Sequence, residues 1–326
     1  MNRLRLSKAK ATVARALGWC IDDSRLVDFI NEAQQRLLNR PTRSVGCDTV
    51  YCFNATSSCL TLPRQIRTVE RWSLDHTPGA VRPEWFDFAF NGWGRWDEAH
   101  PSDHAVLKDT GRACCFNDPT KGAEHFIRVT TDLTEATGTY LWLYGWDESG
   151  NYIRSFVDGE WVDGERIDLS AAPVVTTHKF TSLTQAWKDE TKGMVRLYEW
   201  DGAAVVQALA YYEPSETDPI YRRVLIPGLT AAAASETQVV TVFARLQHIP
   251  VSVDNDTLII GNLPALKLMC MAIKAEEEGR QQDAAALEGK AIHELEGELA
   301  AYMGDGVGVL INVEPDFGAG QVRSVI

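Results

Sequence analysis

The stretch PALKLMCMAIKAEEEGRQQDAAALEGKAIHELEGELAAYM, residues 264–303, predicts two amphipathic helices joined by a short turn. Pro264 can occupy the first position of a helix, where its missing N–H costs nothing. Apolar residues then recur at helical spacing on both sides of Gly279. They are Leu266, Met269, Cys270 and Ile273 in the first helix, and Leu287, Ala291, Ile292, Leu295, Leu299 and Tyr302 in the second. A helical hairpin cannot bury two apolar stripes alone, so we expect a partner elsewhere in the chain.

The expected partner lies at the other end of the sequence. Residues 7–17 predict a helix, and a second helix follows the N-cap cluster Asp22–Ser24 and stops before Pro41. These N-terminal and C-terminal helices would pack as a small bundle, from which everything between them emerges as an insertion. The expected fold class is therefore α+β: a helical bundle formed by the N- and C-terminal helices, with short β-hairpins and an inserted antiparallel β-sandwich.

The apolar period changes after Val45. Residues 49–53 and 58–62 predict two short strands around Asn54–Thr56, which is a hairpin-like signal, and residues 66–74 predict another strand. Strand signals then recur between residues 124 and about 226 at the spacing typical of an antiparallel sandwich. The strands expected there include 140–146, 152–157, 176–180, 194–200 and 208–212, and a further pair is expected at 239–246 and 257–260.

This pattern divides the chain into four parts. A discontinuous helical core covers residues 1–42 and 236–303 and includes strands within 239–260. A connecting region of hairpins and aromatic residues covers 43–121, and the β-sandwich covers 122–230. The Gly-rich stretch 304–326 is expected to be an extended tail that orders only against a partner.

Composition narrows the classes of function. The 326-residue chain has no run of about 18 apolar residues, so no membrane span is expected. Its seven cysteines are odd in number and scattered, which favours a reducing compartment over a disulfide framework. The formal net charge of −13 argues against gripping nucleic acid by its phosphates. The same charge suits a surface that DNA passes without sticking, and equally a protein that needs it only for solubility.

Motifs for catalysis or metal binding are weak throughout. Ser7–Lys10 matches Ser-x-x-Lys without the other elements of that site, and the glycines of 304–308 follow a helix rather than a strand. The histidines and cysteines lack zinc-site spacings. Acidic and amide residues at strand ends could hold calcium, but hairpin turns use the same residue types: Asp147, Glu148, Asn151, Asp158 and Asp163. We predict no catalytic residue, no cofactor and no metal.

An aromatic cluster between residues 83 and 96 is the most unusual local feature. Trp85, Phe88, Trp93 and Trp96 could form a loop that binds a sugar or a protein partner, or their rings could fill a gap between two domains. Nearby carboxylates, among them Glu84 and Asp97, keep open a glycan-binding or glycan-cleaving protein that uses this loop and the sandwich.

Two glycines lie inside the last predicted helix. Gly289 and Gly297 each cost about 1 kcal/mol relative to alanine. They could allow a second helix to approach closely, either from a neighbouring subunit or from within the bundle.

Three segments carry a resemblance to a known family. Residues 29–38, FINEAQQRLL, resemble the early helix of tailed-bacteriophage head-to-tail adaptor proteins, also called connectors or tail tubular A-like proteins. Residues 60–66, LTLPRQI, followed by Val69, are similar to their first hairpin. Residues 243–273, followed by the Ala-rich helix with 291–295, look like their C-terminal half. The match covers about residues 1–75 and 237–326, and the middle β-region departs from the simplest members.

The resemblance implies a structural protein of the virion neck, made in the host cytoplasm and without catalysis. Such adaptors form a ring, usually of twelve copies, between the portal protein and a tail or nozzle protein, and the genome passes through the channel without specific binding when it is ejected. The C-terminal extension commonly reaches toward the portal. The residues that would dock there are Val309, Leu310, Ile311, Val313, Phe317, Val322, Val325 and Ile326. Another tail or head-decoration protein of the virion remains an alternative.

Overall fold

The computed structural model describes residues 4–40, 47–55, 59–75, 77–79, 108–120, 125–157, 159–225 and 238–303. The helices within these ranges are α1 (Leu6–Leu17), α2 (Arg25–Leu38), α4 (Leu263–Glu277) and α5 (Gln281–Met303). The strands are β1 (Asp48–Ala55), β2 (Cys59–Leu62), β3 (Ile66–Leu74), β4 (Thr77–Gly79), β5 (Lys108–Ala113), β6 (Phe126–Thr131), β7 (Tyr140–Trp146), β8 (Arg154–Val157), β9 (Glu160–Asp163), β10 (Glu165–Asp168), β11 (Val174–Val175), β12 (Ser182–Lys188), β13 (Val195–Trp200), β14 (Val205–Tyr212), β15 (Tyr221–Leu225) and β16 (Gln238–Leu246). A 3₁₀ turn, η2, covers Leu169–Ala171.

The helices predicted from the apolar stripes are confirmed. The side chain of Asn262 caps the start of α4, because its oxygen accepts a hydrogen bond of 2.9 Å from the N–H of Ala265. Gly18 ends α1 in the left-handed conformation, at a φ of 72° that suits a residue without a Cβ.

The expected fold class is wrong, because the chain is mainly β. Strand accounts for 39% of it, in five antiparallel sheets, and four α-helices occur among the described residues. The helices do not form a bundle with a core of its own. Leu266 and Ile273 of α4 belong to the same buried cluster as Val240 and Val242 of β16. The physical reason is that the inner face of the sheet is apolar and needs cover, so the helical stripes pack on strands as well as on each other.

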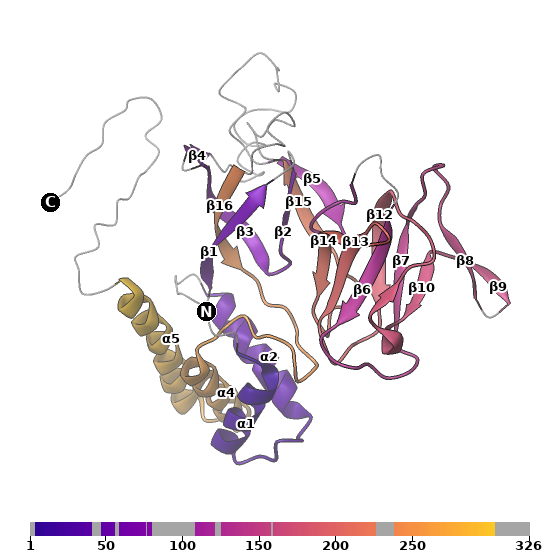
Figure 1. Cartoon of the computed structure of the whole chain (residues 1–326). Coiled ribbons are helices and arrows are strands. Elements are labelled where there is room, and N and C mark those ends of the chain that lie inside the picture. Colours follow the sequence, from indigo (N-terminus) through magenta and orange to yellow (C-terminus); the bar gives the residue numbers. More distant parts are fainter. Residues whose placement is uncertain are drawn as a thin grey trace, which may run out of the picture.

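Two small sheets lie next to the helices (Figure 1). The first has the strand order β1-β16-β3-β4 and the second β2-β15-β5. The hairpin predicted from β1 and β2 is therefore wrong: both segments are strands, but they belong to different sheets. Tyr51 of β1 pairs with Val242 of β16, whereas Thr61 of β2 pairs with Arg223 of β15. Each segment pairs with a strand that is distant in the sequence and buries apolar residues against it, and the two segments do not pair with each other.

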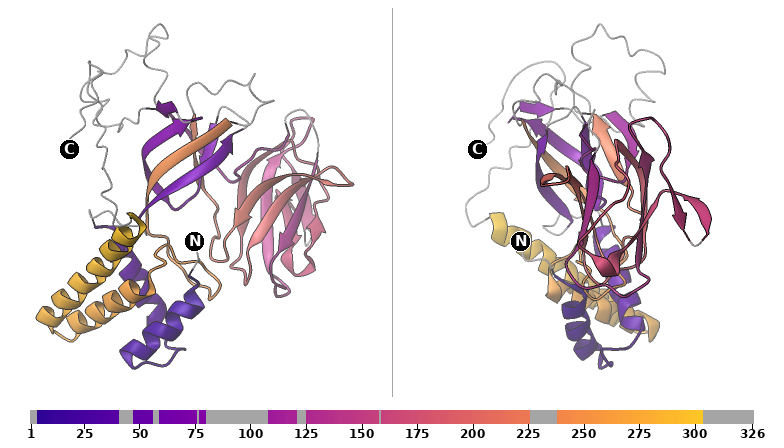
Figure 2. Two further views of the ribbon diagram at one scale, coloured as in Figure 1. Left: turned by 60° about the vertical axis from the view of Figure 1, so that its left-hand side comes forward. Right: turned by 45° about the vertical axis from the view of Figure 1, so that its right-hand side comes forward.

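Residues 125–212 contain a β-sandwich beside these sheets (Figures 1 and 2). One sheet has the order β10-β7-β12 and the other β11-β6-β13-β14, with every pairing antiparallel. The strand predicted at 140–146 is confirmed residue for residue as β7, whose alternate residues Leu141 and Leu143 are fully buried in the core. The β8–β9 hairpin projects from the sandwich on the side away from the helices (Figure 1).

Two neighbouring strands connect the sandwich to the rest of the molecule. β5 enters it and β15 leaves it, and Ala113 pairs with Tyr221 at that point. A polar junction adds to this connection. Arg64 forms an ion pair of 2.7 Å with Glu213, and Asp256 accepts a hydrogen bond of 3.1 Å from the N–H of Ser215. These contacts fix the sandwich against the sheets and the helices.

Two further strand predictions are wrong. At residues 176–180 the backbone N–H groups of Thr177 and His178 bond to the carboxylate of Glu165 instead of a neighbouring strand. At 257–260 only Thr257 makes a β-bridge, to Arg5. The N–H of Ile259 donates instead to the Gln34 side chain of α2, at 2.9 Å. In both places a buried side-chain oxygen takes the donor that a strand partner would have used.

Candidate functional site

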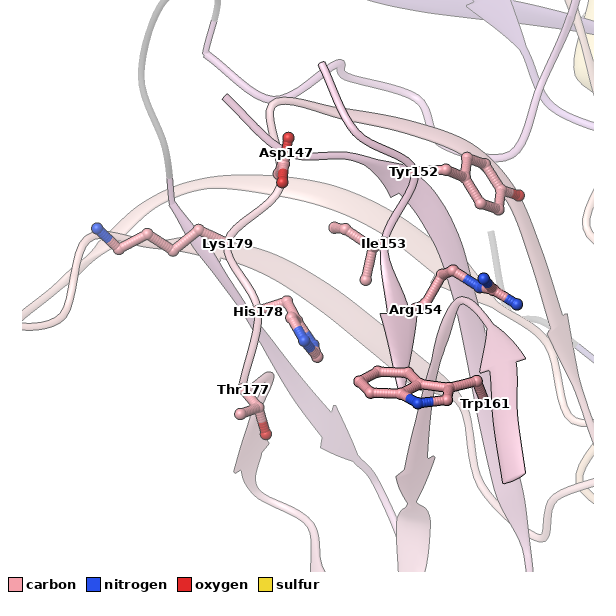
Figure 3. Close-up of a pocket in the computed structure, with 8 residues that line it drawn as sticks. All are labelled: Asp147, Tyr152, Ile153, Arg154, Trp161, Thr177, His178 and Lys179. Carbon is pink, nitrogen blue, oxygen red and sulfur yellow. The ribbon is translucent and has the colours of Figure 1, made fainter. Parts of the chain in front are cut away.

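An open hollow of about 680 Å³ lies at the end of the sandwich that carries the β8–β9 hairpin. Its lining mixes aromatic, apolar and polar side chains: Asp147, Tyr152, Ile153, Arg154, Trp161, Thr177, His178 and Lys179 (Figure 3). In Figure 3 the imidazole of His178 points toward the indole of Trp161, and Ile153 lies close to both. The hollow is therefore lined by the exposed indole of Trp161 together with several hydrogen-bonding side chains.

The β8–β9 hairpin positions Trp161 at the edge of the hollow. Trp161 lies opposite Phe156 in the register, and their rings make an edge contact with centroids 5.6 Å apart. An ion pair of 3.0 Å between Arg154 and Asp163 closes the base of the hairpin. Trp161 and Phe156 are each 63% exposed, more than any other large hydrophobic side chain among the described residues. Such rings are usually mostly buried, so the hairpin holds an aromatic surface in contact with water.

The opposite wall of the hollow is organised by Glu165. This carboxylate is only 6% exposed, and it accepts hydrogen bonds from the backbone N–H of Thr177 and from that of His178, the latter at 3.0 Å. It also lies 2.9 Å from Nδ1 of His178. A ring nitrogen facing a carboxylate carries the proton, which leaves Nε2 as the second functional nitrogen of His178. Glu165 therefore fixes both the backbone and the ring orientation of this wall.

Further aromatic side chains continue from the hollow along the outer face of the β10-β7-β12 sheet. The rings of Tyr152 and Trp146 meet edge to face, with centroids 5.1 Å apart. Farther along β7, Trp142 pairs in register with Trp187 of β12 and with Arg166 of β10. The guanidinium of Arg166 lies 5.9 Å from the Trp142 ring. Alternation along β7 places these rings outward, because Leu141 and Leu143 point into the core.

Two buried charged groups in the sandwich have structural roles. Burial raises the pKa of Glu199, but hydrogen bonds from His125, Thr120 and Gln207 outweigh it and hold that pKa below its ordinary value. Burial lowers the pKa of Lys188 to about 8. Both groups have their hydrogen bonds satisfied inside the protein, and neither lines the hollow.

The acidic residues at the strand ends act as turn and pairing groups. Asp147 accepts a hydrogen bond of 2.8 Å from the N–H of Asn151, and Asp163 pairs with Arg154. Asp158 lies outside the described residues. Over the ranges that the structure describes, no three His, Cys, Asp or Glu side chains come together as a metal site would require.

The aromatic loop and the tail singled out from the sequence lie outside the described residues. The residues concerned are Trp85, Phe88, Trp93 and Trp96 of the loop, and Val309, Leu310, Ile311, Val313, Phe317, Val322, Val325 and Ile326 of the tail. Their proposed roles stay predictions. The glycines of α5 are described: a Cβ at Gly289 or Gly297 would meet no described residue within 4 Å, so neither glycine accommodates a close contact within the described ranges.

Sequence reasoning missed Trp161 and the Glu165–His178 pair. Trp161 lies between the turn signals at Gly159 and Gly164, which predicts a hairpin but not which side of it faces water. Glu165 and His178 are 13 residues apart and belong to different segments, so no local pattern links them.

The geometry of the hollow suits binding better than cleavage. Hydrolysis of a glycosidic bond uses two carboxyl groups that flank it. Asp147 is the one carboxylate among the residues that line the hollow, and Glu165 is occupied behind His178. An exposed indole beside fixed donors and acceptors is instead an arrangement that holds a ligand with one flat apolar face.

Among the described residues, none of the helices combines the length and apolar character needed to cross a bilayer. No family model, curated protein or solved structure matches this chain. What the protein does must be inferred from its own residues and geometry.

Proposed function

We propose that this chain is a structural protein of a tailed-phage virion: a non-catalytic head-to-tail adaptor, which forms a ring between portal and tail through which DNA passes. Twelve copies are the number that the family resemblance suggests. The proposal combines that resemblance with one structural observation.

The observation that carries the proposal is that the segments responsible for the resemblance contact each other. Asn31 in α2 donates to the carbonyl of Val251 and accepts from its N–H, both at 2.9 Å. Arg36 pairs with Glu276 of α4 at 2.6 Å. These residues are more than 200 positions apart in sequence, so their contact supports treating the matched segments as one unit.

The two glycines of α5 support a ring. Gly289 and Gly297 weaken the helix by about 1 kcal/mol each, yet none of the residues that the structure describes uses the space that they leave. Both lie on one face of α5, since they are eight residues apart. A helix of an adjacent copy could approach this face closely. A closed ring needs such head-to-tail contacts between different surfaces of successive copies.

The charge of the chain suits a channel. A net charge of −13 repels phosphates, which would allow DNA to move past the protein without binding. We therefore propose no specific contact with nucleic acid.

Electron microscopy of particles or lysate assemblies that contain the protein, with rotational averaging, tests the proposal directly. A ring of this chain between the portal and the tail is the expected result. Its presence elsewhere in the particle, or its absence from particles, would refute the adaptor role.

The substitution Gly289→Leu tests the ring contact. The variant should melt at the same temperature as the parent or higher, because leucine favours the helix, and yet it should fail to assemble. Ala11→Leu is the matched control, since it adds a leucine at an exposed helical position of α1, away from the glycine face of α5. Assembly of the Gly289→Leu protein at the parent's level would remove α5 from the interface.

The C-terminal segment offers a separate test of portal docking. We expect deletion of residues 305–326 to leave the melting temperature unchanged and to abolish co-purification with the portal protein. Retained docking by the shortened chain would contradict this role for the tail.

A further inference from the structure

We propose that the hollow beside the β8–β9 hairpin is a binding site for a neutral oligosaccharide of hexose or N-acetylhexosamine units, with one sugar ring stacked on Trp161. This site does not depend on the adaptor role, because it belongs to the sandwich alone.

The exposed indole supplies the stacking surface. Trp161 is 63% exposed, and Phe156 contacts it edge-on rather than covering it. One side of a pyranose ring presents a flat array of C–H groups, which matches the electron-rich face of an indole. Stacking would remove apolar area of both partners from water and so favour binding.

Hydrogen-bonding groups surround the position that such a sugar would occupy. Thr177 and Arg154 offer donors, and the carboxylate of Asp147 offers an acceptor. His178 adds a nitrogen whose orientation is fixed by Glu165 at 2.9 Å. Ring hydroxyls act both as donors and as acceptors, so a mixed lining of this kind matches a saccharide. Because Glu165 already holds its wall in place, little ordering is needed when the ligand binds.

The charges of the hollow argue for a neutral ligand. Arg154 is paired with Asp163 at 3.0 Å, and His178 is paired with Glu165. The ammonium of Lys179 lies 5.6 Å from the Phe126 ring and points away from the hollow (Figure 3). Asp147 would repel a sulfate, phosphate or carboxylate group. The lining therefore provides directional hydrogen bonds but no concentrated positive charge of the kind that selects anions.

The aromatic side chains outside the hollow favour a chain of sugars over a single one. Tyr152 lies in the lining, and its ring contacts that of Trp146, which is 42% exposed. A second sugar unit leaving the Trp161 position would meet this pair. An oligosaccharide would thus contact two aromatic surfaces, and its affinity should increase with length.

Calorimetric titration of the full-length protein tests the proposal. The probes are four hexasaccharides that differ in sugar unit or in linkage: maltohexaose, cellohexaose, mannohexaose and chitohexaose. At least one should bind, with a change in tryptophan fluorescence, and the matching monosaccharide should bind more weakly. Binding should also persist when phosphate or sulfate is added in excess.

Variants locate the binding. Trp161→Ala should weaken the affinity about tenfold or more, and Trp161→Phe should restore part of it. Trp200→Ala is the matched control, because Trp200 lies on the other sheet, under Arg128 at 4.8 Å, and does not line the hollow. Thr177→Val keeps the side-chain shape and should weaken binding by removing one hydroxyl.

Three results would overturn the proposal. They are no binding of any of the four hexasaccharides, equal losses of affinity in the Trp161 and Trp200 variants, and displacement of the sugar by phosphate. Self-association that is lost on Trp161→Ala, without sugar binding, would assign the hairpin to a contact between copies instead.

Discussion

Lys188 allows a quantitative test of how the sandwich is attached to the rest of the molecule. It is fully buried, and its ammonium donates to the carbonyls of Asp189 and Pro214 and to the hydroxyl of Thr191, at 3.2, 2.7 and 3.1 Å. Burial lowers its pKa to about 8, although the nearby carboxylates of Glu216, Asp256 and Glu135 favour the charged form. The folded protein therefore releases this proton more readily than the unfolded chain does.

The sign and the size of the effect follow from this difference in pKa. In the unfolded chain a lysine has a pKa of about 10.4. Between the two values the unfolded state binds more protons, so the free energy of unfolding increases with pH. With a folded pKa of about 8, this one group adds about 2 kcal/mol of stability between about pH 7 and about pH 9.5.

Lys188→Met removes the titrating group from the same site. Chemical denaturation of the parent and the variant over this pH range should show a difference in unfolding free energy that changes by about 2 kcal/mol in favour of the parent. Taking the difference cancels the titration of other residues. Lys192→Met is the matched control, because it removes a lysine from an exposed position in the loop that follows β12. A flat difference for Lys188→Met would mean that water reaches this ammonium and that the junction is open.

Further substitutions test other parts of the fold. Leu295→Asp places a charge at a position that is 4% exposed, and it should lower the free energy of unfolding by about 3 kcal/mol or more, measured by helical circular dichroism. Gly145→Ala would bring a Cβ into overlap with the backbone oxygen of Ser182, so the sandwich should lose about 2 kcal/mol or more in a thermal melt; a stable variant would show that the β7–β12 pair can shift. Glu199→Gln should destabilise most at neutral pH, because the carboxylate has a lowered pKa and contributes stability only while ionised. The penalty should shrink as the pH falls below the ordinary glutamate pKa of about 4.3 and toward the lowered pKa of the folded protein. A penalty that is independent of pH would contradict that role.

Local elements were predictable wherever the apolar period was regular. The stripes containing Leu266 and Leu295 identified α4 and α5, and the strand signal at 140–146 identified β7 with the same bounds. The apolar period did not indicate which other helix or strand each element packs against or pairs with. β1 and β2 follow each other in the sequence, and both are strands in the structure. However, β1 pairs with β16, and β2 pairs with β15. Partner choice depends on which distant apolar faces bury each other, and the local apolar period does not show that.

The candidate site was less predictable than the fold. The sequence drew attention to Trp93 and its aromatic neighbours, and these lie outside the described residues. The described hollow depends instead on Trp161 and on the pairing of Glu165 with His178. Alternation alone does not distinguish a tryptophan exposed on a hairpin from one that covers a core. A carboxylate that bonds to a segment 12 and 13 residues away is visible only once both are in place.

The side-by-side strands β5 and β15 bear on how such a gene can change. Ala113 and Tyr221 are register partners, so the chain leaves and returns about 5 Å apart. Removal of the codons between them would leave two ends that a tight turn can join, and the sheet of β2, β15 and β5 could keep its order. A single recombination event could therefore add, remove or exchange the sandwich while the surrounding protein is inherited unchanged.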